Sequence, residues 1–211
     1  THAVLQFRHN QRRARLPAKR WGVYSHRVVQ PRHPLVCDVN TTFDVPHSRF
    51  NDVSRDQFIA AGLKVLVESN EAGVHLAVSE DLFRVVYFQG HPEYDTISLL
   101  KEYKREVSRF VQNLIAEYPP FPKHYFSLRT QAILSEYRVR VIAAKRRGEP
   151  TPIFPEALIR PVLDNTWHDS AEAVINNWMG KVYMCTNNDR RFPFMADINP
   201  NDPLGIRDVI D

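Results

Sequence analysis

The chain has few cysteines and no long apolar run. Its two cysteines among 211 residues, Cys37 and Cys185, lie far apart, and neither has a metal or redox partner at close spacing. This argues against a secreted disulfide scaffold and gives no reason to expect a bound metal. Cys37 follows the apolar residues 34–36, so we expect it, like Cys185, to be a buried small hydrophobe. No stretch approaches the roughly 20 apolar residues that cross a membrane, and we expect no membrane partner.

The sequence also lacks an initial methionine and a secretory signal. It opens on Thr1 and continues into a His- and Arg-rich segment without a long apolar core. We therefore expect a soluble, cytoplasmic protein, and we expect this chain to be one piece of a longer polypeptide. Hydrophobic residues make up 43% and charged residues 25%, which is ordinary globular usage, and the length suits one α/β domain.

Positive charge is concentrated near the N-terminus. Residues 1–50 hold nine Lys or Arg against two Asp, a net +7, which leaves −3 for the remainder of a chain whose net charge is +4. A basic surface can face nucleic acid or the phosphates of a nucleotide-bearing cofactor, and a merely solvated basic surface is the alternative. Because no aromatic stacking platform or known nucleic-acid module is visible, we do not expect a nucleic-acid partner.

Hydrophobic periodicity predicts strands that alternate with helices, which favours an α/β fold with a mainly parallel sheet. Residues 40–50 are predicted to be a loop. Asp95 or Thr96 can cap the helix that ends at Pro119-Pro120, and Asp169 to Glu172 form a plausible capping box for the last helix. The predicted strands are 21–29, 63–68, 74–78 and 83–89; the predicted helices start at residues 1, 57, 95, 124 and 169.

One segment carries residues that suit catalysis. The apolar run 83–89 leads directly into Gly90-His91-Pro92-Glu93. Gly90 permits an unusual backbone turn, and Pro92 keeps His91 out of the helical region. In an extended segment residues i and i+2 project to the same side, so His91 and Glu93 are expected to point into one cleft. A carboxylate beside a ring nitrogen orients the imidazole and stabilises its charged form, as in the base half of a nucleophilic triad.

The His-x-Glu spacing alone is a weak signal, because a surface loop with a histidine and a capping acid has the same pattern. A zinc deaminase also uses His-x-Glu but needs a downstream Pro-Cys-x-x-Cys. Cys185 is the single cysteine downstream, so the deaminase interpretation is excluded.

Five features in a consistent order resemble one family. The hexapeptide 90–95 (Gly-His-Pro-Glu-Tyr-Asp) resembles the active-site signature of the homoserine O-succinyl/acetyltransferases, and 46–50 (Pro-His-Ser-Arg-Phe) resembles their Pro-His-Ser-Arg-aromatic loop. Residues 176–178 (Asn-Asn-Trp) resemble a helix near that family's C-terminus. Lys19 stands ahead of a Gly-Val-Tyr strand, and Arg105 follows the signature at the family's offset.

The resemblance implies a flavodoxin-like fold of the class I glutamine-amidotransferase-like group. It implies a cysteine that takes the acyl group from acyl-CoA, with His91 as general base and Glu93 as its partner, and transfer to the hydroxyl of L-homoserine in methionine biosynthesis. Arg105 would bind the homoserine carboxylate, and Ser48 and Lys19 would line the substrate site. Acyl-CoA is the co-substrate, no bound cofactor is implied, a succinyl donor is favoured over acetyl, and a homodimer is the family expectation.

Two departures from the family accompany the resemblance. Residues 1–5 resemble the start of the helix after the nucleophile, so the cysteine is expected just before Thr1, in the remainder of the polypeptide. The chain then corresponds to the C-terminal portion of a single α/β domain. Residues 119–160 have no clear counterpart in the shorter family members, and we interpret them as an inserted helical segment.

Simpler roles remain open for the substrate-binding candidates. The periodicity places Arg105 on the polar face of its helix, where it would be an ordinary solvent-exposed arginine. Lys19 lies in a basic run, and Ser48 can brace a loop. At the level of the whole protein the alternatives are a glutamine amidotransferase-type subunit, which shares the Cys-His-Glu logic, and a non-catalytic nucleic-acid-binding fragment.

Overall fold

The computed structural model describes residues 1–210, which fall into two compact units. The first unit comprises residues 1–20, 24–93 and those from 166 onwards, and the second comprises 21–23 and 94–165. The first unit contains α1 (His2–His9), β1 (Ala14–Val28, apart from residues 21–23), η1 (Pro34–Val36), β2 (Thr42–Asp52), α2 (Arg55–Ala60), β3 (Lys64–Ser69), β4 (Gly73–Val78), β5 (Val86–Phe88), α6 (His168–Cys185) and α7 (Arg207–Ile210). The second contains α3 (Ser98–Val111), α4 (Leu128–Arg147), α5 (Glu156–Ile159) and η2 (Arg160–Val162).

The five strands form one sheet in the order β2-β1-β3-β4-β5. The pairs β1–β3, β3–β4 and β4–β5 are all antiparallel, with Leu76 opposite Phe88 and Lys64 opposite Val78. The α/β class is confirmed, but the predicted mainly parallel, flavodoxin-like sheet is wrong for these strands. The reason lies in the connections. A short turn joins β3 to β4 and a helix-free loop joins β4 to β5, whereas parallel neighbours need a crossover of about a dozen residues or more.

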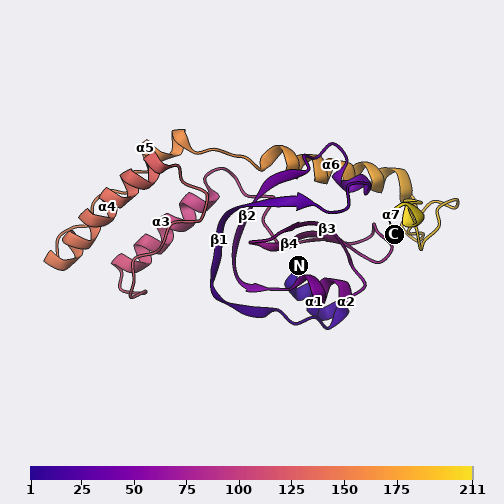
Figure 1. Ribbon diagram of the computed structural model, residues 1–211, viewed down its shortest axis with the longest axis horizontal. Coiled ribbons are helices and arrows are strands. Elements are labelled where there is room, and N and C mark those ends of the chain that lie inside the picture. The colour runs from indigo at the N-terminus through magenta and orange to yellow at the C-terminus, as the bar shows by residue number, and fades with distance from the viewer. Residues whose placement is uncertain (211) are drawn as a thin grey trace. The chain divides into compact units, whose positions relative to one another are not determined.

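Helices cover both faces of this sheet in the first unit. On one face Leu5 of α1 and Phe58 of α2 pack with strand residues such as Val65 and Ala77. On the other face Leu35 of η1 and Val174 of α6 join a core that contains Leu66, Leu76 and Val78. Figure 1 shows α1 and α2 on one side of β3 and β4 and α6 on the other. Side chains alternate between the faces of a strand, so one short hairpin supplies both cores.

Four of the five strands were predicted, including β5 within the predicted segment 83–89, and the prediction failed for β2 at one edge of the sheet. The segments 63–68 and 74–78 correspond to β3 and β4, and 21–29 lies within the longer β1. The loop predicted at 40–50 is wrong, because β2 runs through it. Pro46 lies inside β2, which is possible since β2 is the last strand on its side of the sheet and an edge strand tolerates a residue without an N–H.

The sequence predicts the presence of these helices better than the residues at which they begin. Neither Asp95 nor Thr96 caps α3, which begins at Ser98 after a turn closed by a backbone bond from Ser98 N to Asp95 O. The capping box at Asp169 is likewise absent, because α6 already begins at His168. In α4 the hydroxyl of Ser127 accepts from the Thr130 N–H and starts the helix four residues later than predicted.

Aromatic residues and one glycine organise the second unit. The apolar side of α3 is buried at Leu100, Tyr103 and Val107, and the Trp21 and Tyr103 rings lie 6.2 Å apart. Gly22 has a φ of +147°, and a Cβ there would lie 2.2 Å from the Lys123 carbonyl oxygen. A side chain at this position is therefore excluded by the backbone bonds that Trp21 and Val23 make with Lys123.

The two cysteines have different environments. Cys185 is buried as predicted, but Cys37 is exposed, so that prediction is wrong. In η1 the buried positions are taken by Leu35 and Val36, and the Cys37 thiol faces the Asp38 carboxylate at 3.7 Å.

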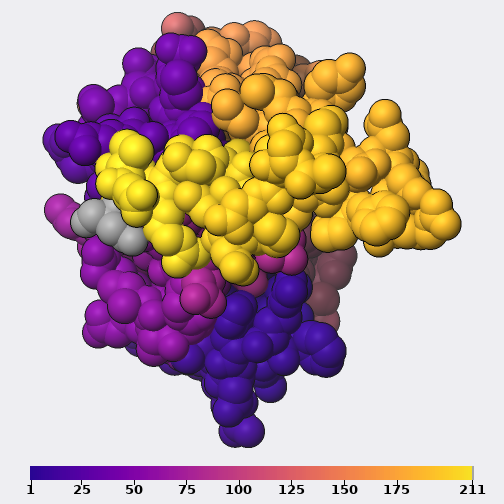
Figure 2. Space-filling model, turned by 90° about the vertical axis from the view of Figure 1, so that its right-hand side faces the viewer, coloured from indigo at the N-terminus to yellow at the C-terminus, as the bar shows by residue number. Residues whose placement is uncertain are grey.

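Beyond α6 the tail spreads over the outer surface, in yellow in Figure 2. It is anchored where Ile210 enters the core and where Lys64 donates to the Ile210 carbonyl at 2.9 Å.

None of the helices within residues 1–210 is both long and apolar enough to cross a membrane.

Candidate active site

Residues 90–95, which we call the signature segment, leave the sheet just after β5. Backbone hydrogen bonds to β4 and β2 hold the chain here on both sides. The Gln89 N–H donates to the His75 carbonyl on β4 at 2.8 Å, which continues the ladder past Phe88. The His91 N–H then donates to the Pro46 carbonyl on β2 at 2.8 Å. His91 is therefore fixed by its main chain to the strand that carries the Pro-His-Ser-Arg motif.

Gly90 is required by close packing. Its φ is not in the left-handed region, so the unusual turn expected from sequence is not its role. A Cβ on Gly90 would lie 2.5 Å from Val45 Cγ1, 2.8 Å from His75 Nδ1 and 2.9 Å from His47 Nε2. Real Cβ atoms do not approach that closely, so only glycine lets the segment rest on β2 and β4.

His91 and Glu93 form the predicted pair. The Nδ1 atom of His91 lies 2.8 Å from Glu93 Oε1, and their side chains are 32% and 66% exposed. An ionised carboxylate can only accept, so Nδ1 of His91 carries the proton of this bond and Nε2 is the nitrogen that can serve as a base. The hydrogen bond from His91 holds the pKa of Glu93 below its usual value, which keeps the carboxylate ionised near neutral pH.

A cleft of about 450 Å³ opens beside this pair, within the range of small-molecule sites. It is formed between the first turn of α1, the segment before β1 and the signature segment. Its polar lining includes Thr1, His2, Arg13, Arg49, His91 and Glu93.

Behind the signature segment lies a buried chain of histidines. Arg49 Nε donates to His47 Nδ1 at 3.2 Å, and His47 Nε2 lies 3.2 Å from His26 Nε2. His26 Nδ1 in turn lies 2.8 Å from the Tyr24 carbonyl. One direction of donation satisfies every bond: Arg49 to His47, His47 to His26, and His26 to Tyr24. Burial lowers the pKa of His26 to about 4 and that of His47 well below its usual value, so both rings are neutral.

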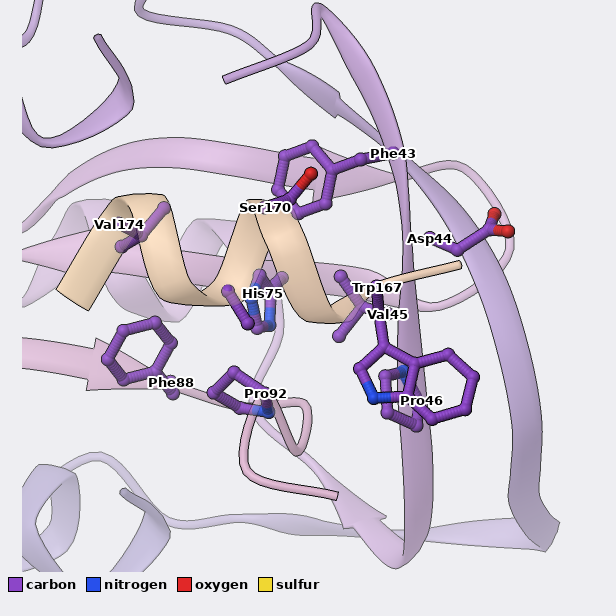
Figure 3. Close-up of a pocket in the computed structure, with 11 residues that line it drawn as sticks. Phe43, Asp44, Val45, Pro46, His75, Phe88, Pro92, Trp167, Ser170 and Val174 are labelled. Atoms are coloured by element: carbon purple, nitrogen blue, oxygen red, sulfur yellow. The ribbon is translucent and has the colours of Figure 1, made fainter. Parts of the chain in front are cut away.

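A second, smaller gap on the other side of the segment serves packing. It measures about 10 Å³, far below the roughly 300–1,000 Å³ of ligand pockets. Figure 3 shows Trp167 and Ser170 of the α6 region, Pro46 of β2 and Pro92 of the signature turn around it. The Thr166 hydroxyl donates to the Asp44 carboxylate at 2.6 Å. These contacts fasten the start of α6 to β2.

The substrate-binding candidates Lys19 and Ser48 lie on neighbouring strands but not in the lining of the cleft. The Lys19 ammonium lies 5.8 Å from the centre of the Phe50 ring, on the β1–β2 pair. Ser48 is half-buried on β2, between His47 and Arg49, whose side chains point to the opposite face. Arg49, which we did not single out from sequence, is the motif residue that lines the cleft.

Arg105 belongs to the second unit. It lies on the exposed side of α3 with its side chain 63% exposed, and its Nε is 3.5 Å from Glu106 Oε1. The polar-face position expected from periodicity is thus observed. Its predicted contact with a homoserine carboxylate depends on the resemblance and stays a prediction.

The Asn-Trp motif of α6 is explained by packing. Asn177 Nδ2 donates to the Leu35 carbonyl at 3.2 Å and to the Cys37 carbonyl at 2.7 Å. Trp178 packs partly buried against the sheet core on the same side. The motif therefore attaches α6 to η1.

Sequence reasoning missed Gln89, His2 and Arg13 as neighbours of His91. A polar Gln89 at the end of an apolar run was the available signal, because a buried amide there needs partners.

Among residues 1–210 no group of three or more His, Cys, Asp or Glu side chains is arranged to hold a metal ion.

Together these features define a class of protein: an α/β protein that presents a histidine oriented by a carboxylate at a strand end, beside a cleft that also receives the start of a helix. The sequence model of the family described as homoserine O-succinyltransferase matches residues 1–188. The chain belongs to the homoserine O-succinyltransferase family.

Individual relatives agree with this assignment. The chain is 66% identical to the homoserine O-succinyltransferase of Nitrosococcus oceani over 98% of its own length and 58% of that protein. The corresponding protein of Allochromatium vinosum is also 66% identical, and that of Methylococcus capsulatus 60%, with the same coverage. The chain thus spans about 58% of the length of the curated relatives it matches.

Proposed function

We propose that the polypeptide containing this chain transfers a succinyl group from succinyl-CoA to the hydroxyl of L-homoserine, a step of methionine biosynthesis. The observation that carries the proposal is the His91–Glu93 pair, 2.8 Å apart at the end of β5, within the region that matches the family. Curated relatives over nearly the whole chain bear the name homoserine O-succinyltransferase, which also supports succinyl over acetyl as the donor group.

In the first half-reaction, a cysteine upstream of Thr1, in the remainder of the polypeptide, is the nucleophile. His91 Nε2 accepts the thiol proton, the thiolate attacks the thioester carbonyl, and the CoA thiolate leaves and takes up the proton from His91. The product is a succinyl-cysteine thioester. Glu93 stabilises the imidazolium through Nδ1.

In the second half-reaction, His91 accepts the proton of the homoserine hydroxyl. The hydroxyl oxygen attacks the acyl-cysteine carbonyl, O-succinyl-homoserine is released, and the proton returns to the cysteine sulfur. Arg105 binds the homoserine carboxylate through its planar fork of donors, and Lys19 and Ser48 contribute to the substrate site. The active species is a homodimer, in keeping with the family expectation.

The test uses the full-length enzyme with His91→Ala. We expect kcat to fall about 10²–10⁴-fold, because the thiol and the hydroxyl lose their general base, with release of CoA thiol as the assay. His168→Ala is the matched control, since it removes an exposed histidine that also faces a glutamate, Glu172 at 3.6 Å, and it should keep wild-type turnover. Wild-type kcat in His91→Ala would overturn the mechanism. Glutaminase turnover above succinyl transfer would replace the proposed function by an amidotransferase.

A further inference from the structure

The side chain of Gln89 uses both ends of its amide in the interior. It is 5% exposed. Its oxygen accepts from the Val53 N–H at 2.8 Å and lies 2.8 Å from His2 Nε2. Its nitrogen donates to the Val74 carbonyl at 2.8 Å and to the Val53 carbonyl at 3.3 Å. One side chain therefore connects β4, the end of β2 and α1.

The backbone partners determine the polarity of the bond to His2. An N–H can only donate and a carbonyl can only accept, so the contacts with Val53 and Val74 fix which amide atom of Gln89 is oxygen. That oxygen faces His2 Nε2, which must then be the donor. The interaction is a directed hydrogen bond from the first turn of α1 to the residue before Gly90.

A second bond fastens the same turn. The Thr1 hydroxyl donates to the Phe88 carbonyl. The first turn of α1 is thus tied at two points to the two residues that precede Gly90-His91, and Thr1, His2, Gln89 and His91 all line one cleft.

We propose that Gln89 and His2 are positioning residues for the reaction: their bond sets the distance between His91 and the nucleophile carried just before α1. This proposal rests on the proposed function, which places the cysteine immediately upstream of Thr1. The physical reason is that a thiol and its base must meet within about 3–3.5 Å, and a misplacement of about 1 Å can cost on the order of 10²-fold in rate. A buried amide with every bond satisfied is a rigid means of holding that distance.

The chain offers a matched control on the same helix. His9, at the other end of α1, lies with Nε2 3.0 Å from the Tyr87 hydroxyl of β5. Like His2 it is a half-buried histidine that bonds α1 to the β5 segment, but it does not line the cleft of His91. Loss of either bond should cost similar stability, and loss of the His2 bond alone should disturb the reacting groups.

The experiment compares His2→Leu, His2→Gln and His9→Leu in the full-length enzyme. We expect His2→Leu to lower kcat about 10–100-fold with the KM for homoserine within about twofold. We expect His2→Gln, which keeps a donor, to recover most of kcat, and His9→Leu to keep kcat. Wild-type kcat in His2→Leu, or an equal loss in His9→Leu, would overturn the proposal.

A second readout needs no turnover. Labelling of the upstream cysteine by iodoacetamide, followed by mass spectrometry across pH, reports its thiolate fraction. His2→Leu should move this profile to higher pH, because a displaced imidazolium stabilises the thiolate less, while the exposed Cys37 serves as an internal reference. An unchanged profile overturns the positioning role. A wild-type enzyme without succinyl transfer would overturn the proposed function and leave this comparison interpretable.

Discussion

At the scale of single residues, the site depends on a position with no side chain. Gly90 rests against Val45, His75 and His47 with contacts that leave no room for a methyl group. Those neighbours are themselves buried, so they have little freedom to move aside. The backbone of His91 is placed by this contact as much as by its own bond to Pro46.

Gly90→Ala should therefore destabilise the protein by about 1–3 kcal/mol, as overpacking does in a dense interior, and should lower turnover by shifting His91. Urea unfolding and succinyl transfer measure the two effects. Gly180→Ala is the control, because Gly180 lies within α6 with nothing within 4 Å of its Cβ position, and alanine there should add about 0.5–1 kcal/mol. If the Gly90→Ala protein is as stable and active as wild type, the residues around Gly90 can move aside for a methyl group, and the close-packing argument is wrong.

The pairing of His91 with Glu93 was predictable from sequence because its geometry is local. His91 and Glu93 are two residues apart with a proline between them, and the extended backbone brings them together without tertiary information. The bond between His2 and Gln89 spans 87 positions, and no periodicity of the sequence encodes such a pairing. Arg49 belongs to the Pro-His-Ser-Arg motif, but the motif alone does not reveal that its side chain is buried.

At the scale of elements, burial decided which predictions held. β3 and β4 were recognised because their apolar residues fill both cores. β2 resembles a loop in the sequence, because Pro46 and its polar neighbours interrupt the apolar alternation of this edge strand. The direction of the strands was inferred from element order, and the short connection between β3 and β4 is what excludes a parallel pair. The interpretation of 119–160 as an insertion stays a prediction.

Removing the hydrogen bonds that attach α6 to η1 tests whether the Asn-Trp motif has a structural role. Asn177→Ala removes two bonds to the carbonyls of Leu35 and Cys37, and we expect a loss of about 1–2 kcal/mol in unfolding free energy with unchanged KM for homoserine. Asn176→Ala, at the exposed neighbouring position, should change neither. If Asn177→Ala keeps its stability but loses activity, the motif belongs to the substrate site instead.

At the scale of the whole molecule, the first unit encloses four histidines whose burial favours the neutral ring. His26, His33, His47 and His75 are each at most 3% exposed. Burial lowers the pKa of His26 and His33 to about 4 and those of His47 and His75 well below the usual value. Each ring therefore takes up its proton at lower pH in the folded protein than in the unfolded chain, whose histidines titrate near 6.5.

The sign of the resulting pH dependence follows from this difference. Above about pH 6.5 neither state is protonated at these rings and their contribution to stability is fully present. As the pH falls from about 6.5 towards 4, the unfolded chain binds protons that the folded protein excludes, and each histidine removes up to about 1.4 kcal/mol per pH unit. Urea unfolding at pH 7.5, 6 and 5 should thus show a progressive loss of stability on the acid side, in a range where most carboxylates remain ionised.

His33 allows one contribution to be isolated, because its ring is distant in sequence from the signature segment and has simple partners. Its Nδ1 accepts from the Leu35 N–H at 3.2 Å, and its Nε2 donates to the Leu82 carbonyl at 3.0 Å. His33→Gln substitutes an amide that does not titrate, so the slope of stability against pH between 6.5 and 5 should become shallower by about 1 kcal/mol per unit. His168→Gln, at an exposed histidine, is the matched substitution with which the change in slope is compared. A wild-type protein equally stable at pH 7.5 and pH 5 would mean that the buried rings are hydrated or charged in solution, and the neutral hydrogen-bond chain behind His91 would have to be abandoned with them.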